Sequence, residues 1–108
     1  ILDPGVKDPT FAADSFNNTV LKLLPLADGT VVVAGWFDSI SDSSFTTYAR
    51  RGVARLTASG LIDPSFATAG GSNAMPVYDL ALQPDGKILA VGNFTTFNGS
   101  ARNRIAYI

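Results

Sequence analysis

The sequence of 108 residues has no cysteine, no histidine and no glutamate. Without cysteine the chain has no disulfide, no thiolate nucleophile and no thiolate metal site. Without histidine it has no Ser-His-Asp triad, no imidazole zinc site and no side chain with a reference pKa near neutrality. We therefore expect no catalytic residues, no metal site and no cofactor, and we expect that the protein is not an enzyme.

Charge and long apolar runs are also scarce. Charged residues make up 16% of the chain and the net charge is -1, which supplies no field for nucleic acid or for an anionic membrane surface. The arginines fall into two short clusters, which we expect to be solvated strand ends rather than a nucleic-acid patch. The longest apolar run, around residues 31–37, is far too short to cross a membrane. We expect neither nucleic-acid binding nor membrane insertion.

The residues that are abundant indicate strands and turns. All nine acidic residues are aspartate, which favours turns, whereas the missing glutamate favours helices. The chain also has 10 glycines and 6 prolines beside an apolar fraction of 46%. These values exclude a disordered tail and a collagen, and they favour an all-β fold.

Three signatures occur twice in the chain. LADGTVVVAGWF at 26–37 returns as LQPDGKILAVGNF at 82–94, GVKDPTF at 5–11 returns as GLIDPSF at 60–66, and RRGVARL at 50–56 returns more loosely as RNRIAYI at 102–108. Repeats of roughly 50 to 57 residues are typical of propeller blades. We therefore divide the chain into a first repeat, residues 1–56, with a long loop at 39–49, and a second repeat, residues 57–108.

Each repeat is predicted to form a four-stranded blade. In the second repeat, 77–83 and 87–94 are expected to be strands joined by a Pro-Asp-Gly turn. We expect a loop at 95–101 and a third strand at 102–108, and a short fourth piece at the segment corresponding to IDPSF (62–66).

The second strand of each blade is apolar on both faces. In the first repeat Val31 and Val33 alternate with Val32 and Ala34, and the second repeat shows the same pattern in KILAVG. A sheet with one wet face would alternate apolar and polar residues, so these strands require a packed layer on both sides. Stacked propeller blades provide this. The glycine that ends each run predicts a bulge or a close backbone approach.

These motifs together resemble the delta-60 repeat. The resemblance is carried by LALQPDGKILAVGNFTTFNGSARNRIAYI at 80–108 and by LIDPSF at 61–66, and it covers nearly all of the chain as two units. The first unit departs from the pattern, because LADG lacks the proline and a longer loop replaces the Asn-Gly loop. The resemblance implies a bacterial propeller-type repeat in a secreted or cell-surface protein. It implies no particular activity.

Two blades do not close a ring, since propellers usually hold about four to eight. Both ends of the chain fall at the same phase of the repeat, which predicts that the blades are completed by other blades. We expect either a cyclic homo-oligomer, with a trimer favoured, or neighbouring repeats of a longer chain.

The candidate ligand-binding residues lie at loops and strand ends: Trp36, Asp38, Asp42, Asn93, Phe97 and Asn98. Trp36 aligns with Asn93; its ring is suited to stacking on a sugar, although a core position beside Phe37 is the preferred interpretation. Asp38 and Asp42 have some character of a calcium loop, but a solvated polar loop is favoured. The aspartates of the Asp-Gly turns, Asp28 and Asp85, and those of the Asp-Pro motifs, Asp8 and Asp63, are expected to bond their own turns.

The leading functional hypothesis is a non-catalytic scaffold, adhesion or protein-interaction module of an extracellular or cell-surface protein. The alternative is a carbohydrate-binding propeller with sites between blades, built from Trp36, Phe97 and nearby Asn or Asp residues. A hydrolase with paired aspartates is a third hypothesis. Expected partners are copies of the chain or adjacent repeats, together with glycans or surface proteins.

Overall fold

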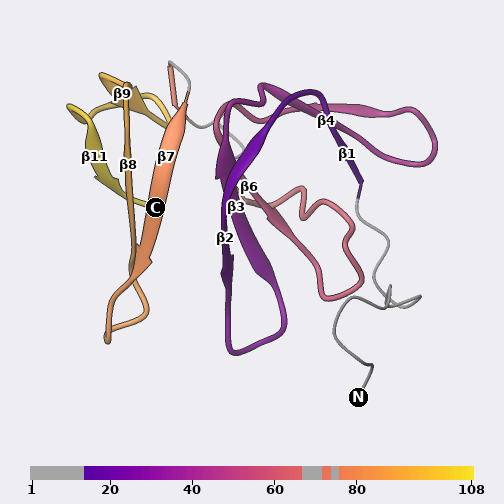
Figure 1. Cartoon of the computed structure of the whole chain (residues 1–108), viewed down its shortest axis with the longest axis horizontal. Helices are drawn as coiled ribbons and strands as arrows, with labels where there is room; N and C mark the ends of the chain where they lie inside the picture. The colour runs from indigo at the N-terminus through magenta and orange to yellow at the C-terminus, as the bar shows by residue number, and fades with distance from the viewer. Residues whose placement is uncertain (1–13, 67–71, 74–75) are drawn as a thin grey trace.

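The computed structural model describes residues 14–66, 72–73 and 76–108, and every regular element in these ranges is a β-strand (Figure 1). The expectation of an all-β fold is confirmed. The strands are β1 (Ser15–Phe16), β2 (Val20–Pro25), β3 (Val31–Gly35), β4 (Ser39–Ser41), β5 (Thr47–Ala49), β6 (Val53–Leu56), β7 (Val77–Leu82), β8 (Ile88–Gly92), β9 (Thr96–Phe97), β10 (Ser100–Ala101) and β11 (Ile105–Tyr107).

Two antiparallel sheets share one connectivity. The first sheet has the strand order β2-β3-β6, and the second sheet has the order β7-β8-β11. A third, smaller sheet, β1-β4-β5, and the hairpin β9-β10 extend from these two. The first and second sheets stand face to face, with β2 and β3 against β7 (Figure 1).

The hairpin turns explain why the strands stop where they do. Between β2 and β3, the Gly29 amide donates to the Leu26 carbonyl, and the Leu26 amide donates to the Thr30 carbonyl. Gly29 has φ +89°, a left-handed value that glycine adopts without steric cost. The turn between β7 and β8 has the same pair of bonds around Gly86, so the Asp-Gly signature marks this turn in both repeats.

Both central strands end at a glycine that permits a close backbone approach, as predicted. A Cβ at Gly35 would collide with the backbone oxygen of Thr19, and a Cβ at Gly92 would collide with that of Pro76. Opposite each glycine the partner strand has a register shift, at Val20/Lys22 in β2 and at Val77/Asp79 in β7.

The two faces of β3 belong to two different cores. Val32 and Ala34 are fully buried in the core between the two sheets, together with Leu80, Ile88 and Ala90 of the second sheet. Val33 is also fully buried, but on the opposite face, where it packs with Phe37, Ile40, Ala54, Leu56 and Ile62. The prediction that this strand is covered on both sides is confirmed.

The same prediction holds on only one face of β8. Ile88 and Ala90 are buried against the first sheet, whereas Leu89 is half-buried and Val91 is 37% exposed. No described element packs on that outer face, so its apolar side chains remain in contact with solvent.

Two local expectations differ from the structure. Residues 95–101, expected as a loop, contain the hairpin β9-β10, because Asn98 (φ +49°) and Gly99 (φ +83°) form a two-residue turn with both φ angles positive, as a type I′ turn requires. In the first sheet, the expected fourth strand is an isolated bridge between Leu56 and Ile62. The division at residues 56 and 57 stays a prediction.

In the part of the chain that the structure describes, no helix is present that is long and apolar enough to cross a membrane.

Candidate functional site

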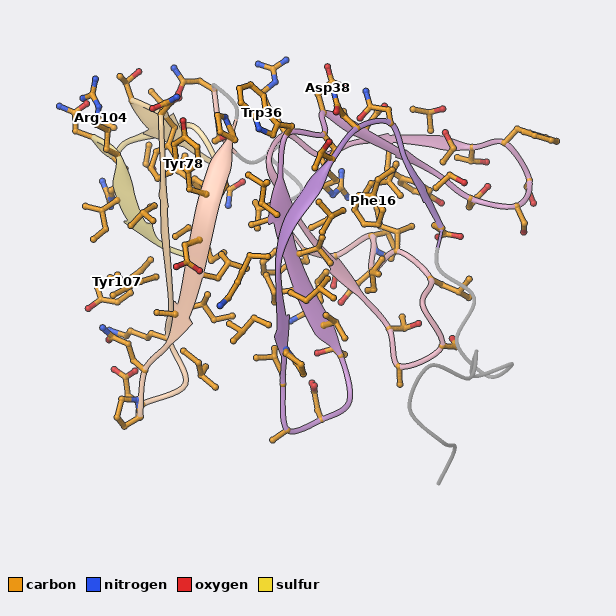
Figure 2. All side chains as sticks on the ribbon, viewed as in Figure 1. Phe16, Trp36, Asp38, Tyr78, Arg104 and Tyr107 are labelled. Atoms are coloured by element: carbon orange, nitrogen blue, oxygen red, sulfur yellow. The ribbon has the colours of Figure 1, made fainter. Side chains whose placement is uncertain are left out.

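The loops that follow β3 and β8 form one edge of the molecule, which we call the loop edge. Figure 2 shows Trp36, Asp38 and Arg104 along this edge. Trp36 is 43% exposed, whereas its neighbour Phe37 is fully buried. The preferred interpretation of Trp36 as a core residue is therefore wrong: both residues lie beyond the end of β3, and Phe37 takes the inner position against Phe16.

Two asparagines that were not among the candidate residues position the loop edge. The Oδ1 atom of Asn17 accepts hydrogen bonds from the backbone amides of Asp38 (3.0 Å) and Ser39 (3.2 Å). In the second repeat, Oδ1 of Asn73 accepts from the amides of Thr95 (2.8 Å) and Thr96 (3.0 Å). The shared position in the repeat is the only sequence signal for this role.

The candidate residues Asp38 and Asn93 already have partners on this edge. Asp38 Oδ1 accepts a hydrogen bond from Nδ2 of Asn17. Nδ2 of Asn93 donates to the hydroxyl of Tyr78 at 3.1 Å. Each of these polar groups contributes to the local structure of its own repeat. Trp36 is a large aromatic side chain that faces solvent on this edge.

Asp42 organises the hairpin formed by β4 and β5. Its Oδ1 accepts hydrogen bonds from the amides of Ser44 (2.9 Å) and Thr46 (3.0 Å), and its Oδ2 accepts from the hydroxyl of Tyr48 at 3.3 Å. The favoured expectation of a simply solvated loop is incomplete, because this carboxylate holds the turn together. Among the described residues, no three side chains of the metal-binding types come together.

Phe45 lies at the tip of this hairpin and is 90% exposed. Its backbone has φ +63°, a left-handed conformation that is a rare outlier for a bulky residue. The Phe45 amide donates to the Asp42 carbonyl at 3.0 Å, so the turn is fixed. The hairpin projects from the first sheet on the side away from the second sheet (Figure 1). In the sequence, Phe45 falls within the long loop at 39–49, and no local pattern marks it as functional.

Phe97 and Asn98, two candidates for the carbohydrate-binding alternative, lie in the hairpin formed by β9 and β10. Phe97 is only 4% exposed and packs edge-on against Phe94, with ring centroids 5.1 Å apart. Phe97 therefore presents little surface to a ligand, and its role in a binding site stays a prediction. Asn98 occupies the left-handed turn position between β9 and β10.

Two carboxylates line one surface pocket, and the hydrolase hypothesis stays untested. Asp14 and Asp42 line a pocket of about 240 Å³ together with Tyr48 and Ile62. Asp14 Oδ2 accepts a hydrogen bond from the Ile62 amide at 2.7 Å, so both carboxylates accept hydrogen bonds that support the fold. Partial desolvation, followed by the charge of Asp42, raises the pKa of Tyr48 above its ordinary value, which keeps this phenol neutral.

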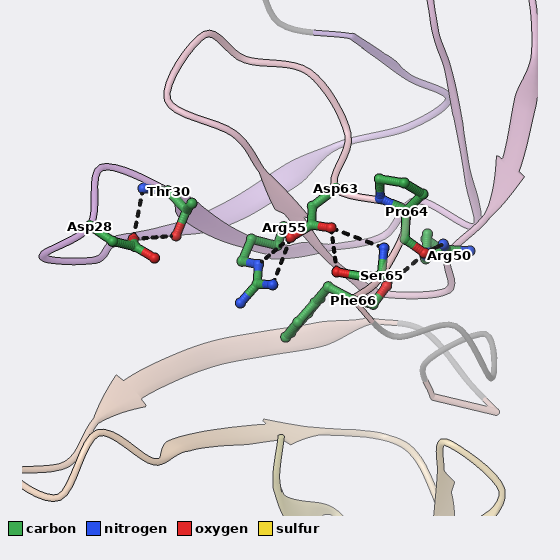
Figure 3. Close-up of polar contacts among 8 residues, drawn as sticks. All are labelled: Asp28, Thr30, Arg50, Arg55, Asp63, Pro64, Ser65 and Phe66. Atoms are coloured by element: carbon green, nitrogen blue, oxygen red, sulfur yellow. Dashed lines mark hydrogen bonds and ion pairs between the residues drawn. The ribbon is translucent and has the colours of Figure 1, made fainter.

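The Asp-Pro-Ser-Phe segment is fastened to β6 (Figure 3). Asp63 Oδ2 lies 2.6 Å from Nη2 of Arg55, and Asp63 Oδ1 accepts bonds from the hydroxyl and the amide of Ser65. The bonds from Ser65, followed by the guanidinium of Arg55, lower the pKa of Asp63 to about 2. The Arg55 guanidinium also lies over the ring of Phe66 at 5.0 Å. The expectation that Asp63 bonds its own turn is confirmed; Asp8 lies outside the described residues.

Asp28 bonds its own turn as expected. Its Oδ1 accepts from the hydroxyl of Thr30 at 2.6 Å and from the Thr30 amide at 3.0 Å, and these bonds lower the pKa of Asp28 below its ordinary value. Asp85 Oδ1 accepts from the Lys87 amide at 3.0 Å.

Arg50 corrects the expectation that the arginine clusters are solvated strand ends. Its side chain is only 8% exposed and donates to the carbonyls of Ala49 (2.8 Å), Pro64 (3.0 Å) and Phe66 (3.0 Å). Guanidinium has five N–H donors and can satisfy several carbonyls at once. Arg50 therefore joins the end of β5 to the Asp-Pro-Ser-Phe segment.

The repeated antiparallel sheets, stacked face to face around a doubly covered strand, define a propeller-type repeat fold. A family model described as "Domain of unknown function (DUF5122) beta-propeller" matches residues 26–66 and 83–106. The chain belongs to this family. The comparison with curated proteins found no match, and neither did the comparison with solved structures.

Proposed function

We propose that the chain is a non-catalytic module of two delta-60-type repeats that acts as a scaffold for protein contacts in an extracellular or cell-surface protein. The extracellular setting is supported by the resemblance of residues 80–108 to that repeat. The non-catalytic role is supported by the polar groups described above, which are used to hold turns and segments together.

The observation that carries the proposed interaction role is the exposed Phe45 on a fixed hairpin tip. A left-handed backbone costs a non-glycine residue roughly 1–2 kcal/mol, and such outliers concentrate at functional sites. Burial of a phenylalanine in a partner contributes about 1.5–3 kcal/mol. Because Asp42 holds the turn in place (Ser44 and Thr46 amides on Oδ1, both at about 3 Å), Phe45 loses little further conformational entropy on binding.

The test is selection of a random peptide library displayed on phage against the immobilised chain. We expect the recovered peptides to lose binding to Phe45→Gly, which removes the ring and relieves the backbone strain. The matched control is Thr46→Ala on the same hairpin, which we expect to retain binding. Peptides that bind the wild-type chain and Phe45→Gly equally would contradict the proposal.

One observation favours carbohydrate binding as a second candidate. Trp36 is 43% exposed at the loop edge, and an exposed indole is suited to stacking on a sugar face. A glycan array with the wild-type chain and with Trp36→Ala tests it: a signal that Trp36→Ala loses supports this function, and broad silence of the wild type removes it.

A further inference from the structure

Two apolar sheet faces lie at opposite ends of the stack. The first outer face, on the first sheet, surrounds a pocket of about 330 Å³ with a lining that includes Phe16, Leu23, Pro25, Val31, Val33 and Leu56. The second outer face, on the second sheet, is formed by Asp79, Ala81, Leu89, Val91, Ile105 and Tyr107. Leu23 is 58% exposed and Ile105 is 53% exposed, so both faces present large side chains to solvent.

Within one chain, the inner face of the first sheet packs against the inner face of the second sheet. By register, each inner face corresponds to the outer face of the other sheet. In β2 and β3, Leu23 pairs with Val33 and Leu24 pairs with Val32. In β7 and β8, the corresponding pairs are Leu80 with Ala90, and Ala81 with Leu89. The exposed pair Ala81–Leu89 therefore corresponds to the buried pair Leu24–Val32.

The reverse correspondence holds for the other end of the stack. The pair Leu23–Val33 on the first outer face corresponds to Leu80–Ala90, which is buried between the two sheets. By register, the second outer face is thus equivalent to the buried face of the first sheet, and the first outer face is equivalent to the buried face of the second sheet. A second copy stacked in the same direction would repeat the interface that already exists within one chain.

The charges favour a head-to-tail order, in which the second outer face of one copy meets the first outer face of the next. Nζ of Lys22 on β2 lies 3.5 Å from Oδ1 of Asp79 on β7, across the interface between the sheets. The two residues occupy the same register position in their sheets, opposite Ala34 and Val91. In a head-to-tail stack, Asp79 of one copy therefore meets Lys22 of the next. Stacking two second sheets in the same direction would instead bring two aspartates together.

We propose that the second outer face binds the first outer face of another copy of this chain, in a head-to-tail contact that repeats the interface within the chain. Heterologous contacts of this type close into rings when the rotation permits. The two interfaces differ in two respects: Val33 is already buried by side chains of its own repeat, among them Ile40 and Ile62, and one corner is filled differently. Gly52 lies against Val77 within the chain, where a Cβ would come within 2.7 Å of Cγ2, and the corresponding residue of the second sheet is the longer Arg104. Phe45 lines neither face, although its hairpin projects on the same side of the first sheet as the first outer face.

The test uses sedimentation velocity over a concentration series with two face variants. Ile105→Lys charges the second outer face, and Leu23→Lys charges the first. We expect the wild-type chain to assemble, and we expect each variant alone to lose assembly, with the dissociation constant raised by more than about tenfold, as for a central interface residue. An equimolar mixture of the two variants should form dimers and nothing larger, because one intact face of each kind remains.

Leu61→Lys, in an exposed turn outside both faces, is the matched control and should assemble as the wild type does. Thermal unfolding monitors the folding of each variant, and Tyr107→Lys or Leu23→Ser replaces a variant that does not fold. A wild-type chain that stays monomeric overturns the proposal. So does a mixture without dimers, or assembly that Ile105→Lys abolishes and Leu23→Lys leaves intact, which would indicate a face paired with itself.

Discussion

Asn17 and Asn73 make the same set of hydrogen bonds at equivalent positions of the two repeats. Each Oδ1 accepts hydrogen bonds from two consecutive backbone amides in the loop beyond the central strand. Each Nδ2 donates a hydrogen bond to the side chain of the first of those two loop residues. The paired amides are more than twenty residues away in sequence. Each asparagine therefore ties the entrance of a repeat to its loop edge.

Asn17→Ala removes these bonds and should lower the free energy of unfolding by about 1–2 kcal/mol, the value expected for a few partly exposed hydrogen bonds. The control is Asn18→Ala, because Oδ1 of Asn18 accepts only from the adjacent Thr19 in the described contacts; its cost should stay below about 0.5 kcal/mol. Equal costs in urea unfolding would contradict the role given to Asn17.

Arg104→Gly should stabilise the chain. Arg104 has φ +65° at the position where the first repeat has Gly52 (φ +78°), and both amides donate to the carbonyl of the phenylalanine after the central strand. Relief of the left-handed strain, less the entropy cost of glycine, predicts a gain of about 0.5–1 kcal/mol.

The opposite exchange, Gly52→Ala, should destabilise the chain by at least about 2 kcal/mol, because it adds both strain and a collision with Val77. Thermal or urea unfolding of the two variants measures both effects. A loss of stability in Arg104→Gly would show that the arginine side chain contributes more than its backbone costs.

Arg50→Met should destabilise the chain by about 2–4 kcal/mol, because it leaves carbonyls in the protein interior without their charged donor. The adjacent Arg51 is the matched control: it is exposed and makes one long bond, 3.3 Å to the Asn73 carbonyl, so Arg51→Met should cost less than about 1 kcal/mol. The comparison of their urea midpoints decides whether Arg50 is structural; similar midpoints would speak against it.

The lowered pKa of Asp63 predicts that the chain loses a defined part of its free energy of unfolding in acid. Its pKa is about 2 in the folded chain and 3.8 ordinarily, so ionisation of Asp63 favours the folded state. This contribution is fully present above about pH 5 and is lost as the pH falls from there through the folded pKa near 2. The free energy of unfolding of Asp63→Asn should therefore fall less between pH 5 and pH 2 than that of the wild type.

The matched control is Asp85→Asn, which changes an aspartate in an exposed hairpin turn. It should retain the acid-dependent loss that Asp63 causes. Identical pH profiles for the wild type and Asp63→Asn would refute this assignment.

The features that the sequence predicts well are those that repeat along the strand or along the chain. Alternating apolar residues placed Val32 and Val33 on opposite faces, and the recurrence of Gly35 and Gly92 marked two close approaches. The Asn98-Gly99 pair is also a strong hairpin signal, so the hairpin at β9 and β10 was predictable although a loop was expected there.

Other features depend on contacts between distant segments, and no local pattern encodes them. Arg50 is buried because the Asp-Pro-Ser-Phe segment passes over it. Trp36 and Phe37 have similar hydrophobicity, and only the packing of Phe16 decides which of them is buried. The exposure and the backbone angle of Phe45, which mark it as a candidate, depend on the folded hairpin and are not encoded in the local sequence.

The stacked-sheet architecture depends on the two faces of β3. One face packs against the second sheet, and the opposite face packs against other segments of the first repeat. Nuclear Overhauser cross-peaks between methyl groups report on both packings at once. We predict cross-peaks from Val32 and Ala34 to the methyls of Val77 and Leu80, and from Val33 to those of Ile40 or Ile62. Cross-peaks from Val33 to Val77 or Leu80, or none between β3 and β7, would contradict this architecture.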